Sequence, residues 1–440
     1  MTNLELGIYS LPVLLLLIFL RMPIGLAMLA VGMAGTTIAM GGPIIVLAQL
    51  KGQVYTTFSN YSLSIVPLFL LMGQFATLGG MSQALFKAAE AFLGHRKGGV
   101  AMASVGACAG FGAICGSSLA TAATMGQVAL PELKRYGYSG GLSTATLAAG
   151  GTLGILIPPS VVLVIYAILT EQNIAKLFVA AFIPGLLAAI GYMIVIRIIV
   201  AVSPGNSSVM ERLPWAQRLV VLSRVWPVLL VFGLVVGGIY FGWFTPTEAA
   251  AIGCAGTGLI ALFGGGLTWA TLTDAIMKTA QNTAMIFLII LGAGFYNAFL
   301  ALTHVPQEMS SFVVGLEVSP WTILVVILCI YLIFGCVMDS LSMILLTVPI
   351  FFPIVSTLDF GLTPEETALW FGIIVLIVVE VGLITPPVGM NLFVISAMDR
   401  TTSIVQTYKY ILPFVASDIV RTAILVAFPA ITLGLMRVIY

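Results

Sequence analysis

Long hydrophobic runs separated by short polar stretches dominate this chain, and the runs form two matching series. Most are long enough to cross the roughly 30 Å hydrocarbon core of a bilayer as a helix. The first series covers residues 8–20, 24–40, 64–79, 99–131, 143–169 and 177–202. The second covers 226–241, 246–264, 283–302, 321–354, 367–397 and 410–437. The pattern predicts an all-α polytopic membrane protein with two halves, 1–202 and 226–440, joined by the polar connector 203–225.

Local sequence supports an internal duplication. The stretch Phe111–Ser117 places Phe, Gly and Ser at the same spacing as Phe334–Ser340. Further along, Gly154–Pro159 parallels Gly382–Pro387, and each ends in a double proline. The duplication predicts that corresponding helices of the two halves break at corresponding places, because proline removes a backbone donor and clashes with the preceding turn.

The fourth run of each half, 99–131 or 321–354, is too long for one crossing and contains small polar residues near its middle. It either crosses the membrane twice as two short helices or enters and returns as a re-entrant hairpin. Outside these runs, the stretch 268–281 contains a tryptophan and two charges and fits an interfacial helix that braces the rest.

Charge favours the hairpins. With two re-entrant hairpins, each half has five crossings, and the alternation places 13 basic residues on one side. These are Arg21, Lys87, Arg96, Lys97, Lys134, Arg135, Arg197, Arg212, Arg218, Arg224, Lys278, Arg400 and Lys409. The other side has only Lys51, Lys176 and Arg437. The positive-inside rule makes the first side, with the connector 203–225, cytoplasmic and places both termini outside.

An odd number of crossings per half requires the second half to be inserted upside down. Residues 1–225 carry 12 basic and five acidic side chains, whereas residues 226–440 carry five basic and 11 acidic ones. Equivalent loops therefore face opposite compartments. The sequence predicts an inverted-topology repeat of about ten transmembrane helices plus two re-entrant hairpins, a recurrent plan of secondary transporters.

Composition narrows the class further. Hydrophobic residues make up 60% of the 440 residues and charged ones 8%, against roughly 25% in soluble domains. The apolar segment 8–20 follows an acidic residue and precedes no small-residue cleavage site, so it predicts a first membrane helix rather than a signal peptide. The five cysteines are scattered over apolar segments, and the two histidines lie in polar connections. Their spacing fits neither a zinc site nor a group of catalytic residues. An enzyme, ATP-driven transport by this chain alone, and a nucleic-acid partner are not expected.

Irregular backbone at membrane depth indicates a transport site, because unpaired backbone groups cannot face lipid. The sequence predicts four such places, two hairpin tips and two Pro-Pro breaks. Unwound segments expose carbonyl oxygens that suit Na⁺, and half-helix N-termini suit a carboxylate. Hydroxyl groups are added by Ser117, Ser118, Thr121, Ser340, Ser342 and Thr385. The competing interpretation is that these small residues only let helices pack closely.

Charged and polar residues within the runs have two interpretations each. Asp339 at the second tip is either an ion or tip-ordering ligand or a cap of the second arm. Glu380 before the second break either pairs with a buried partner, orders backbone or takes part in transport. Asp418 and Arg421, three residues apart, predict a mutual salt bridge. Asn391 is a candidate polar lining group.

Several motifs resemble a known family. They are Gly116–Thr124 (GSSLATAAT), Leu130–Tyr138 (LPELKRYGY), Gly150–Ser160 (GGTLGILIPPS), Pro67–Gly73 (PLFLLMG) and Thr385–Phe393 (TPPVGMNLF). Together they resemble the large membrane subunit of the TRAP (tripartite ATP-independent periplasmic) transporters, and the resemblance covers nearly the whole chain. The length fits a large subunit to which the small subunit is not fused.

The resemblance implies an elevator mechanism, in which a domain of hairpins and broken helices slides against a scaffold. It implies a location in the lipid bilayer of the bacterial inner membrane and Na⁺ as the coupling ion, with no other cofactor. The implied partners are a small four-helix membrane subunit and a periplasmic substrate-binding protein. The implied substrate is an organic anion such as sialic acid or a C4-dicarboxylate.

Site residues follow from the same resemblance. The first Na⁺ site would use Cys115, Ser118, Gly154, Ile157 and Pro159, largely through backbone carbonyls. Cys115 stands where relatives commonly have serine, which speaks against a hydroxyl ligand there. The second site would use Gly335, Asp339, Gly382, Thr385 and Val388. Candidate substrate-binding residues are Gly116, Ser117, Ser340 and Asn391.

Other functions remain open at this stage. A stand-alone Na⁺/carboxylate symporter or a Na⁺/H⁺ antiporter would have the same architecture. A passive channel would conduct without a Na⁺ gradient, and a membrane enzyme is disfavoured by the missing catalytic set. The sequence leaves the identity of the anion, the Na⁺ stoichiometry and the oligomeric state undetermined.

Overall fold

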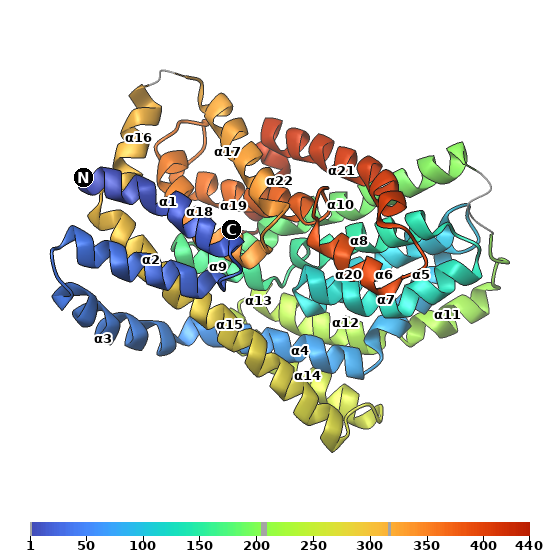
Figure 1. The fold of residues 1–440 in the computed structure, drawn as a ribbon. Coiled ribbons are helices and arrows are strands. Elements are labelled where there is room, and N and C mark those ends of the chain that lie inside the picture. Colours follow the sequence, from blue (N-terminus) through green and yellow to red (C-terminus); the bar gives the residue numbers. More distant parts are fainter. Residues whose placement is uncertain (1, 204–208, 316–317) are drawn as a thin grey trace.

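The computed structural model describes residues 2–203, 209–315 and 318–440, and within these residues the chain forms helices and no strands (Figure 1). The first half contains α1 (Asn3–Phe19), α2 (Ile24–Ala39), α3 (Ile44–Phe58), the short 3₁₀ helix Tyr61–Ser64, α4 (Ile65–Leu78), α5 (Met81–Leu93), α6 (Gly99–Cys115), α7 (Ser118–Arg135), α8 (Gly140–Leu156), α9 (Val161–Leu169) and α10 (Ile174–Val202).

The connector contains α11 (Trp215–Ser223), and the second half begins with α12 (Trp226–Phe232), a π-helical turn (Gly233–Gly237) and α13 (Gly238–Tyr240). It continues with α14 (Pro246–Phe263), α15 (Trp269–Leu302), α16 (Val305–Gly315), α17 (Pro320–Gly335), α18 (Ser340–Ser356), α19 (Pro364–Gly382), α20 (Met390–Met398), α21 (Ile404–Ala427) and α22 (Pro429–Ile439).

The chain is a multi-pass membrane protein. Five of the described helices are long and apolar enough to cross a membrane, and seven spans result if each strongly bent helix pair is one span. Shorter apolar helices, among them α1 and α2, lie beside them. Large hydrophobic side chains on the surface of α1, α10, α15 and α21 are exposed, as expected of helices that face lipid.

The two halves repeat one packing pattern. Helix α8 packs against α21, the last long helix of the second half, and α19 packs against α10, the last helix of the first half. In the same way α9 packs on α18 of the second hairpin, and α20 packs on α7 of the first. Exchanging the halves therefore reproduces the same neighbours, as a duplicated chain requires.

The hairpins lie toward opposite ends of the molecule. Figure 1 shows α6 and α7 toward the end where α11 lies, and α17 and α18 toward the end where the N-terminus and α16 lie. Their tips meet between these ends, as shown below. This arrangement fits two re-entrant hairpins that enter from opposite sides; which side is cytoplasmic remains a prediction.

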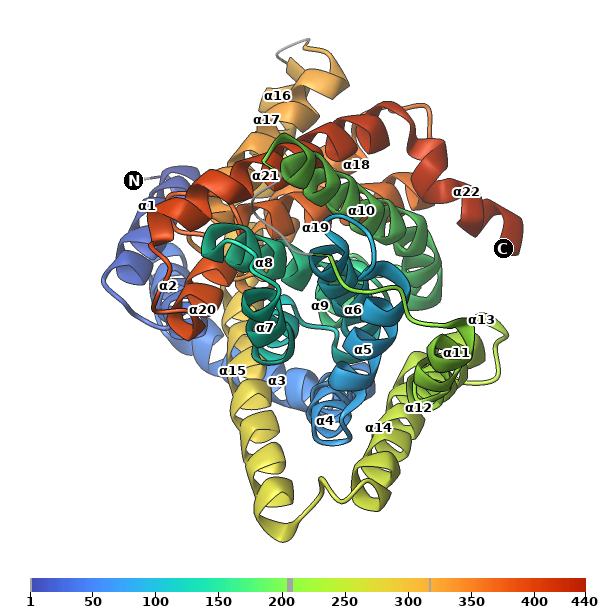
Figure 2. The ribbon, with the colours of Figure 1, turned by 90° about the vertical axis from the view of Figure 1, so that its right-hand side faces the viewer.

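Close helix crossings in the outer part of the fold depend on glycine. A Cβ added to Gly25 of α2 would lie 2.8 Å from the backbone of Ile289 in α15, and one on Gly32 would lie 2.7 Å from Phe295. Small residues let membrane helices approach backbone to backbone. The pair α2 and α15 is therefore a tightly packed support beside the hairpins. Figure 2 shows α14 and α15 extending beyond the remainder of the molecule.

Some elements differ from the sequence-based expectation. The stretch 268–281 is the beginning of the continuous 34-residue helix α15 rather than a separate interfacial helix. The connector 203–225 contains helix α11, and the run 410–437 divides at Phe428 into α21 and α22. No proline interrupts α15, whereas Pro429 begins α22, so the presence or absence of a local breaker accounts for the first and the last of these three differences.

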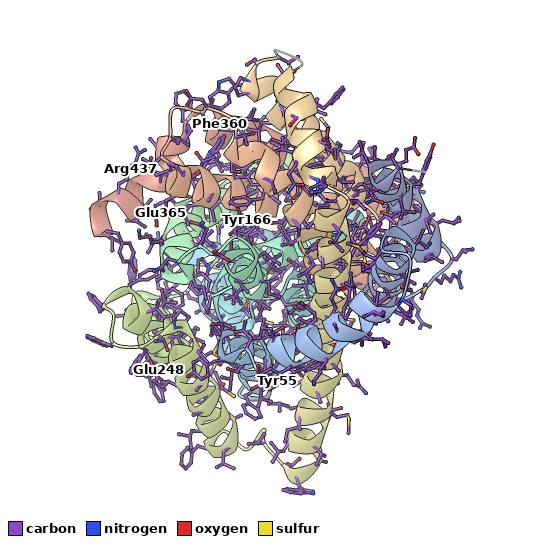
Figure 3. The ribbon with its side chains drawn as sticks, turned by 90° about the vertical axis from the view of Figure 1, so that its left-hand side faces the viewer. Tyr55, Tyr166, Glu248, Phe360, Glu365 and Arg437 are labelled. Atoms are coloured by element: carbon purple, nitrogen blue, oxygen red, sulfur yellow. The ribbon has the colours of Figure 1, made fainter. Side chains whose placement is uncertain are left out.

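Ion pairs tie the end of the chain to the beginning of α19. Lys176 lies 2.6 Å from Glu365, and Arg437 lies 2.7 Å from Glu366 (Nζ or Nε to Oε1). Figure 3 shows Glu365 and Arg437 near one another at the edge of the molecule. The first pair joins α10 to α19, and the second joins α22 to α19.

Candidate functional site

Each hairpin turns at a capped helix N-terminus. In the first, α6 ends at Cys115, Gly116 adopts a positive φ of 64°, and the Ser117 hydroxyl accepts a hydrogen bond from the Ala120 amide at 3.4 Å. In the second, the Asp339 carboxylate caps α18 and accepts from the Ser342 amide at 3.1 Å. Such caps satisfy backbone donors that the first turn of a helix leaves free.

Each Pro-Pro pair ends a helix inside the protein. Helix α8 stops at Leu156, the Pro158–Pro159 bond is cis, and α9 starts after Ser160 at an angle of 45°. In the second half α19 ends at Gly382 and α20 starts at Met390, with a cis Pro386–Pro387 bond between them. The predicted breaks therefore occur where the sequence places them. The first is buried, whereas in the second Pro387 is exposed and Thr385, Pro386 and Val388 are half-buried.

In each half, one glycine–glycine crossing holds the hairpin tip against the break. A Cβ on Gly112 of α6 would lie 2.5 Å from the Cα of Gly154 in α8. A Cβ on Gly382 of α19 would lie 2.5 Å from the Cα of Gly335 in α17. The crossings occupy corresponding positions in the two halves. Backbone carbonyls of a tip and a break can approach one another only because neither helix has a side chain there.

A cavity of about 430 Å³, here the central cavity, lies where the two tips meet. It is bounded by the N-terminal turns of α7, α9 and α18 and by α4 and α15. None of the described residues that line it is a lysine, arginine or histidine. Its polar lining consists of Ser117, Ser118, Asn282, Asp339 and Ser340.

The predicted substrate-binding residues separate into two places. Gly116, Ser117 and Ser340 line the central cavity. Asn391 does not line it; the residue is buried between α20 and α8, and its side-chain amide donates to the Ala148 carbonyl at 3.2 Å. Its Oδ1 atom is buried without a hydrogen-bond partner among the described residues. Asn391 thus faces helix α8 instead of the cavity.

The residues predicted for the first ion site lie together. A Cβ on Gly154 would meet the Ser117 carbonyl at 2.7 Å, and one on Gly116 would meet the Pro159 carbonyl at 3.1 Å. Cys115 and Ser118 flank this tip, and Ile157 adopts an extended conformation as the cap of α8. A backbone carbonyl of the tip therefore lies against the helix before the break, and a carbonyl of the break lies against the tip; oxygen atoms are the donors that a hard cation prefers.

Thr121 belongs to the same region, although the resemblance did not single it out. Its hydroxyl is buried, contacts the position where a Gly154 side chain would start, and has no hydrogen-bond partner among the described residues. Buried hydroxyl groups are normally paired. The signal in the sequence was its spacing, because Thr121 lies three residues after Ser118 and so on the same face of α7.

The residues predicted for the second ion site surround the other break. Gly335 and Gly382 form the crossing, and the Thr385 hydroxyl donates to the Val381 carbonyl at 2.6 Å. Val388 precedes Gly389, whose amide donates to the Cys336 carbonyl of the tip at 3.2 Å. The Asp339 carboxylate accepts from both the amide and the hydroxyl of Ser342, so it caps α18.

Glu380 connects the two hairpins. This buried residue of α19 accepts hydrogen bonds from the Ser118 hydroxyl on one oxygen and from the Ser340 hydroxyl, at 2.6 Å, on the other. The two serines belong to opposite halves and both line the central cavity. From the sequence, Glu380 was one of several intramembrane acids without a stated partner.

The predicted salt bridge of Asp418 with Arg421 is confirmed, with an N–O distance of 2.9 Å. The Tyr192 hydroxyl donates to the same carboxylate at 2.7 Å and lies 2.9 Å from the hydroxyl of Thr152. This buried network joins α21 to α10 and α8. The network contacts α8, the helix that leads into the first break, and its residues do not line the central cavity.

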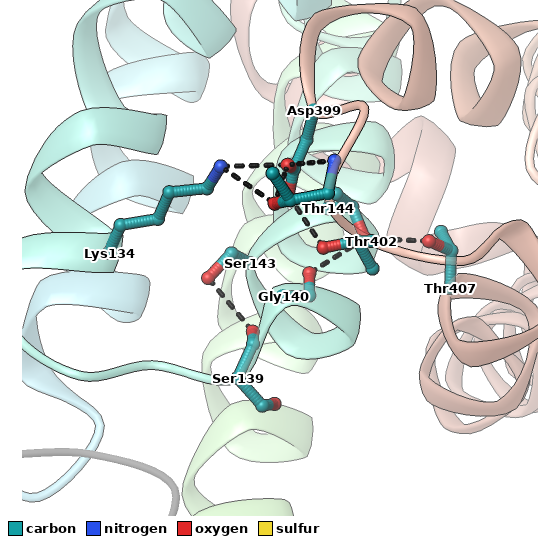
Figure 4. Close-up of polar contacts among 9 residues, drawn as sticks. Lys134, Ser139, Gly140, Ser143, Thr144, Asp399, Thr402 and Thr407 are labelled. Carbon is teal, nitrogen blue, oxygen red and sulfur yellow. Dashed lines mark hydrogen bonds and ion pairs between the residues drawn. The ribbon is translucent and has the colours of Figure 1, made fainter.

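A second polar cluster holds the far end of the first hairpin. Lys134 donates to Asp399 at 2.7 Å, and Asp399 also accepts from the hydroxyls of Thr401 and Thr402 at 2.6 Å each (Figure 4). Nearby, the hydroxyls of Thr144 and Thr407 lie 2.8 Å apart. These contacts connect the first hairpin and α8 to the segment that follows α20.

No group of three or more His, Cys, Asp or Glu side chains that could hold a metal ion occurs among the described residues.

Comparison with known proteins identifies close relatives. Residues 11–431 match the model of the DctM component of the tripartite ATP-independent periplasmic transporters. The C4-dicarboxylate TRAP transporter large permease protein DctM of Pseudomonas aeruginosa is 37% identical over 408 residues, which cover 92% of this chain and 93% of that protein. The sialic acid TRAP transporter large permease protein SiaM of Vibrio cholerae is 29% identical over 422 residues, 95% of each chain.

A solved structure has a related fold. The crystal structure of the YdaH transporter of Alcanivorax borkumensis superposes with a TM-score of 0.59, covering 87% of this chain and 89% of that one. Its sequence is 14% identical, so the similarity concerns the fold alone.

Proposed function

The chain belongs to the DctM family of tripartite ATP-independent periplasmic transporters, as a large permease subunit, and from this premise we propose that it performs Na⁺-coupled uptake of an organic anion across the bacterial inner membrane. Both relatives described above are named as permeases for carboxylates, a C4-dicarboxylate and sialic acid. The proposed substrate is accordingly a small carboxylate of one of these two kinds.

The observation that carries the proposal is the central cavity. The N-terminal turns of α7, α9 and α18 bound it, and no cationic side chain lines its described part. Helix N-termini present free N–H groups and the positive end of the helix dipole, which together bind anions. The N-termini of α7 and α9, which have neutral serine caps, can therefore bind a carboxylate without a lysine or arginine, whereas the N-terminus of α18 already holds the Asp339 carboxylate.

Coupling to Na⁺ is supported by the chemistry of the two breaks. Each break brings carbonyl and hydroxyl oxygens of a tip close to those of an interrupted helix, across a glycine crossing. A monovalent cation there would offset the negative charge of a bound carboxylate in the adjacent cavity. Binding of ion and substrate would then favour one another, which is the requirement for symport.

Movement would follow the elevator scheme. The tips and breaks carry the proposed sites, whereas α4 and α15 line the same cavity from outside the hairpins. In the proposal the hairpins and broken helices slide as one body against α2, α4, α14 and α15. The tripartite family further suggests two partners, a small four-helix membrane subunit and a periplasmic protein that delivers the anion.

The test uses proteoliposomes that contain this chain with its small subunit, an inward Na⁺ gradient and a labelled C4-dicarboxylate or sialic acid. We expect uptake that requires both the Na⁺ gradient and the cognate binding protein. Equal uptake without the binding protein would instead indicate a stand-alone symporter, and uptake without Na⁺ would contradict the coupling.

A further inference from the structure

Glu380 lies where the two halves of the molecule meet. Its side chain belongs to α19, two residues before the glycine crossing at Gly382, and only 1% of the residue is exposed. Ser118 donates to Oε2, and Ser340 donates to Oε1 at 2.6 Å. One carboxylate therefore holds one hydroxyl from each hairpin tip.

The two serines occupy the same place in their hairpins. Each is the first residue of the second arm and follows the residue that caps that arm, Ser117 before α7 and Asp339 before α18. Counted from Phe111 and Phe334, Ser118 lies one position later than Ser340, so the bridge through Glu380 joins the same turn of the two tips. A displacement of either tip changes the hydrogen bonding of the same carboxylate.

The charge of Glu380 has no partner within the described protein. Lys, Arg and His side chains form no ion pair with it there, and the buried Arg421 is paired with Asp418. Taking an isolated carboxylate into a membrane interior is costly unless a positive charge lies close by. Two hydroxyl donors compensate only part of that cost, so a cation beside the tips would stabilise this arrangement.

The proposed ion ligands include one carboxylate, that of Asp339, which lies at the second tip alone and caps α18. The remaining ligands are neutral carbonyl, hydroxyl and thiol groups. Glu380, in contrast, contacts Ser118 of the first site directly and Ser340, the neighbour of Asp339, at the second. Its charge is therefore available to both sites.

Given the Na⁺ coupling proposed above, on which this inference rests, we propose that Glu380 is the positioning residue that couples the two Na⁺ sites. It supplies a negative charge shared by both. Through Ser118 and Ser340 it also makes the ordering of one tip favour the ordering of the other. Occupation of one site then raises the affinity of the other, and the two ions bind cooperatively.

The test compares Glu380→Gln and Glu380→Asp with the unsubstituted chain in the complete transporter. Two quantities are measured: the Na⁺ concentration for half-maximal thermal stabilisation, with choline replacing Na⁺, and the Hill coefficient of Na⁺-activated uptake. We expect Glu380→Gln to raise the half-maximal Na⁺ concentration about tenfold or more and to bring the Hill coefficient close to unity. Glu380→Asp, which keeps the charge, should recover part of both.

Matched variants separate this role from a purely structural one. Glu366→Gln removes a carboxylate that is paired with Arg437 far from the tips and should leave both Na⁺ quantities unchanged. Ser118→Ala and Ser340→Ala should each reduce the Hill coefficient. They also decide the question if Glu380→Gln fails to fold, because unchanged Na⁺ cooperativity in both serine variants would overturn the inference.

The remaining outcomes are distinct. Unchanged Na⁺ affinity and cooperativity in a folded Glu380→Gln variant would overturn the inference and leave the proposed function standing. A different result would also overturn the inference. If uptake by the unsubstituted chain depends on the proton gradient, and Glu380→Gln loses this dependence but keeps its Na⁺ activation, Glu380 is a proton carrier. An unsubstituted transporter without any response to Na⁺ would overturn the proposed coupling itself.

Discussion

Asp399 is a buried carboxylate at the end of α20 that three side chains hold in its ionised form. Burial alone would raise its pKa, but the hydrogen bonds from Lys134, Thr401 and Thr402 outweigh burial and lower the pKa well below the usual value. An aspartate in the unfolded chain has a pKa of about 3.9. The resulting stabilisation is therefore complete above about pH 4 and is lost as the pH falls toward the folded-state value.

We expect Asp399→Asn to lower the free energy of unfolding by about 2 kcal/mol at neutral pH, because hydrogen bonds to a charged group are lost. The difference from the unsubstituted chain should shrink as the pH falls below about 4. Thermal unfolding in detergent at several pH values measures both. Asp274→Asn is the control, since its pair with Lys278 is more than half exposed on both sides and should contribute under about 1 kcal/mol. Equal effects of the two substitutions would contradict the role given to Asp399.

Thr385 lies in the second break, and the role of its hydroxyl group can be tested by substitution. Its hydroxyl donates to the carbonyl of Val381, in the last turn of α19. If that turn contributes to a Na⁺ site, Thr385→Ala should raise the Na⁺ concentration for half-maximal uptake several-fold. Thr422→Ala is matched, because Thr422 makes the same bond to the residue four positions earlier, in α21 and outside the breaks. A Na⁺ response that is the same in both variants would exclude Thr385 from the site.

At the scale of whole elements, the glycine crossings give the sharpest expectation. A methyl group on Gly382 would meet backbone atoms of Gly335 in the opposing helix, which cannot move aside as a flexible side chain can. Overpacking of this kind costs about 1–3 kcal/mol. We expect Gly382→Ala to lower the unfolding temperature and to reduce uptake by separating the tip from the break.

The control for the crossing is Gly52→Ala in α3, where nothing lies within 4 Å of an added Cβ. Alanine is the better helix former, so this variant should keep or slightly gain stability. Unfolding curves of the two variants, measured side by side, check the comparison. If Gly382→Ala were as stable as Gly52→Ala, the second crossing would not be a tight backbone contact.

These elements also show what could be predicted from the sequence. Glycine and proline are strong local signals, so the two hairpins and two breaks were located within a few residues, and the ion pair of Asp418 with Arg421 followed from helical spacing. The bridge through Glu380 could not be predicted, because its partners lie 262 and 40 positions away and meet only in the folded protein. Asn391 illustrates the same limit, since its face is set by the packing of α20 on α8.

The molecule as a whole has its long-range ion pairs at the places that the charge pattern predicts. The assignment of loops to sides puts Lys134 and the segment around Asp399 on one side and Lys176, Glu365, Glu366 and Arg437 on the other. The structure pairs Lys134 with Asp399, Lys176 with Glu365, and Arg437 with Glu366. Each pair thus joins residues predicted to share a side. The arrangement of loops is supported, and the identity of the two compartments remains a prediction.

Labelling of single cysteines tests which side is cytoplasmic. Ser207 in the connector lies outside the described residues, so the exposed Arg212 is the better position, with the exposed Ser319 before α17 as its counterpart at the opposite end. The excess of basic residues places Arg212 inside. In intact cells we expect a membrane-impermeant maleimide to label Ser319→Cys and to leave Arg212→Cys unlabelled until the membrane is permeabilised.

The unsubstituted chain controls for native cysteines, of which Cys329 is exposed. The reverse pattern would invert the whole topology, and with it the direction from which each hairpin enters. Labelling of both positions from outside would contradict the predicted threading, because the three runs between them, 226–241, 246–264 and 283–302, place the two loops on opposite sides.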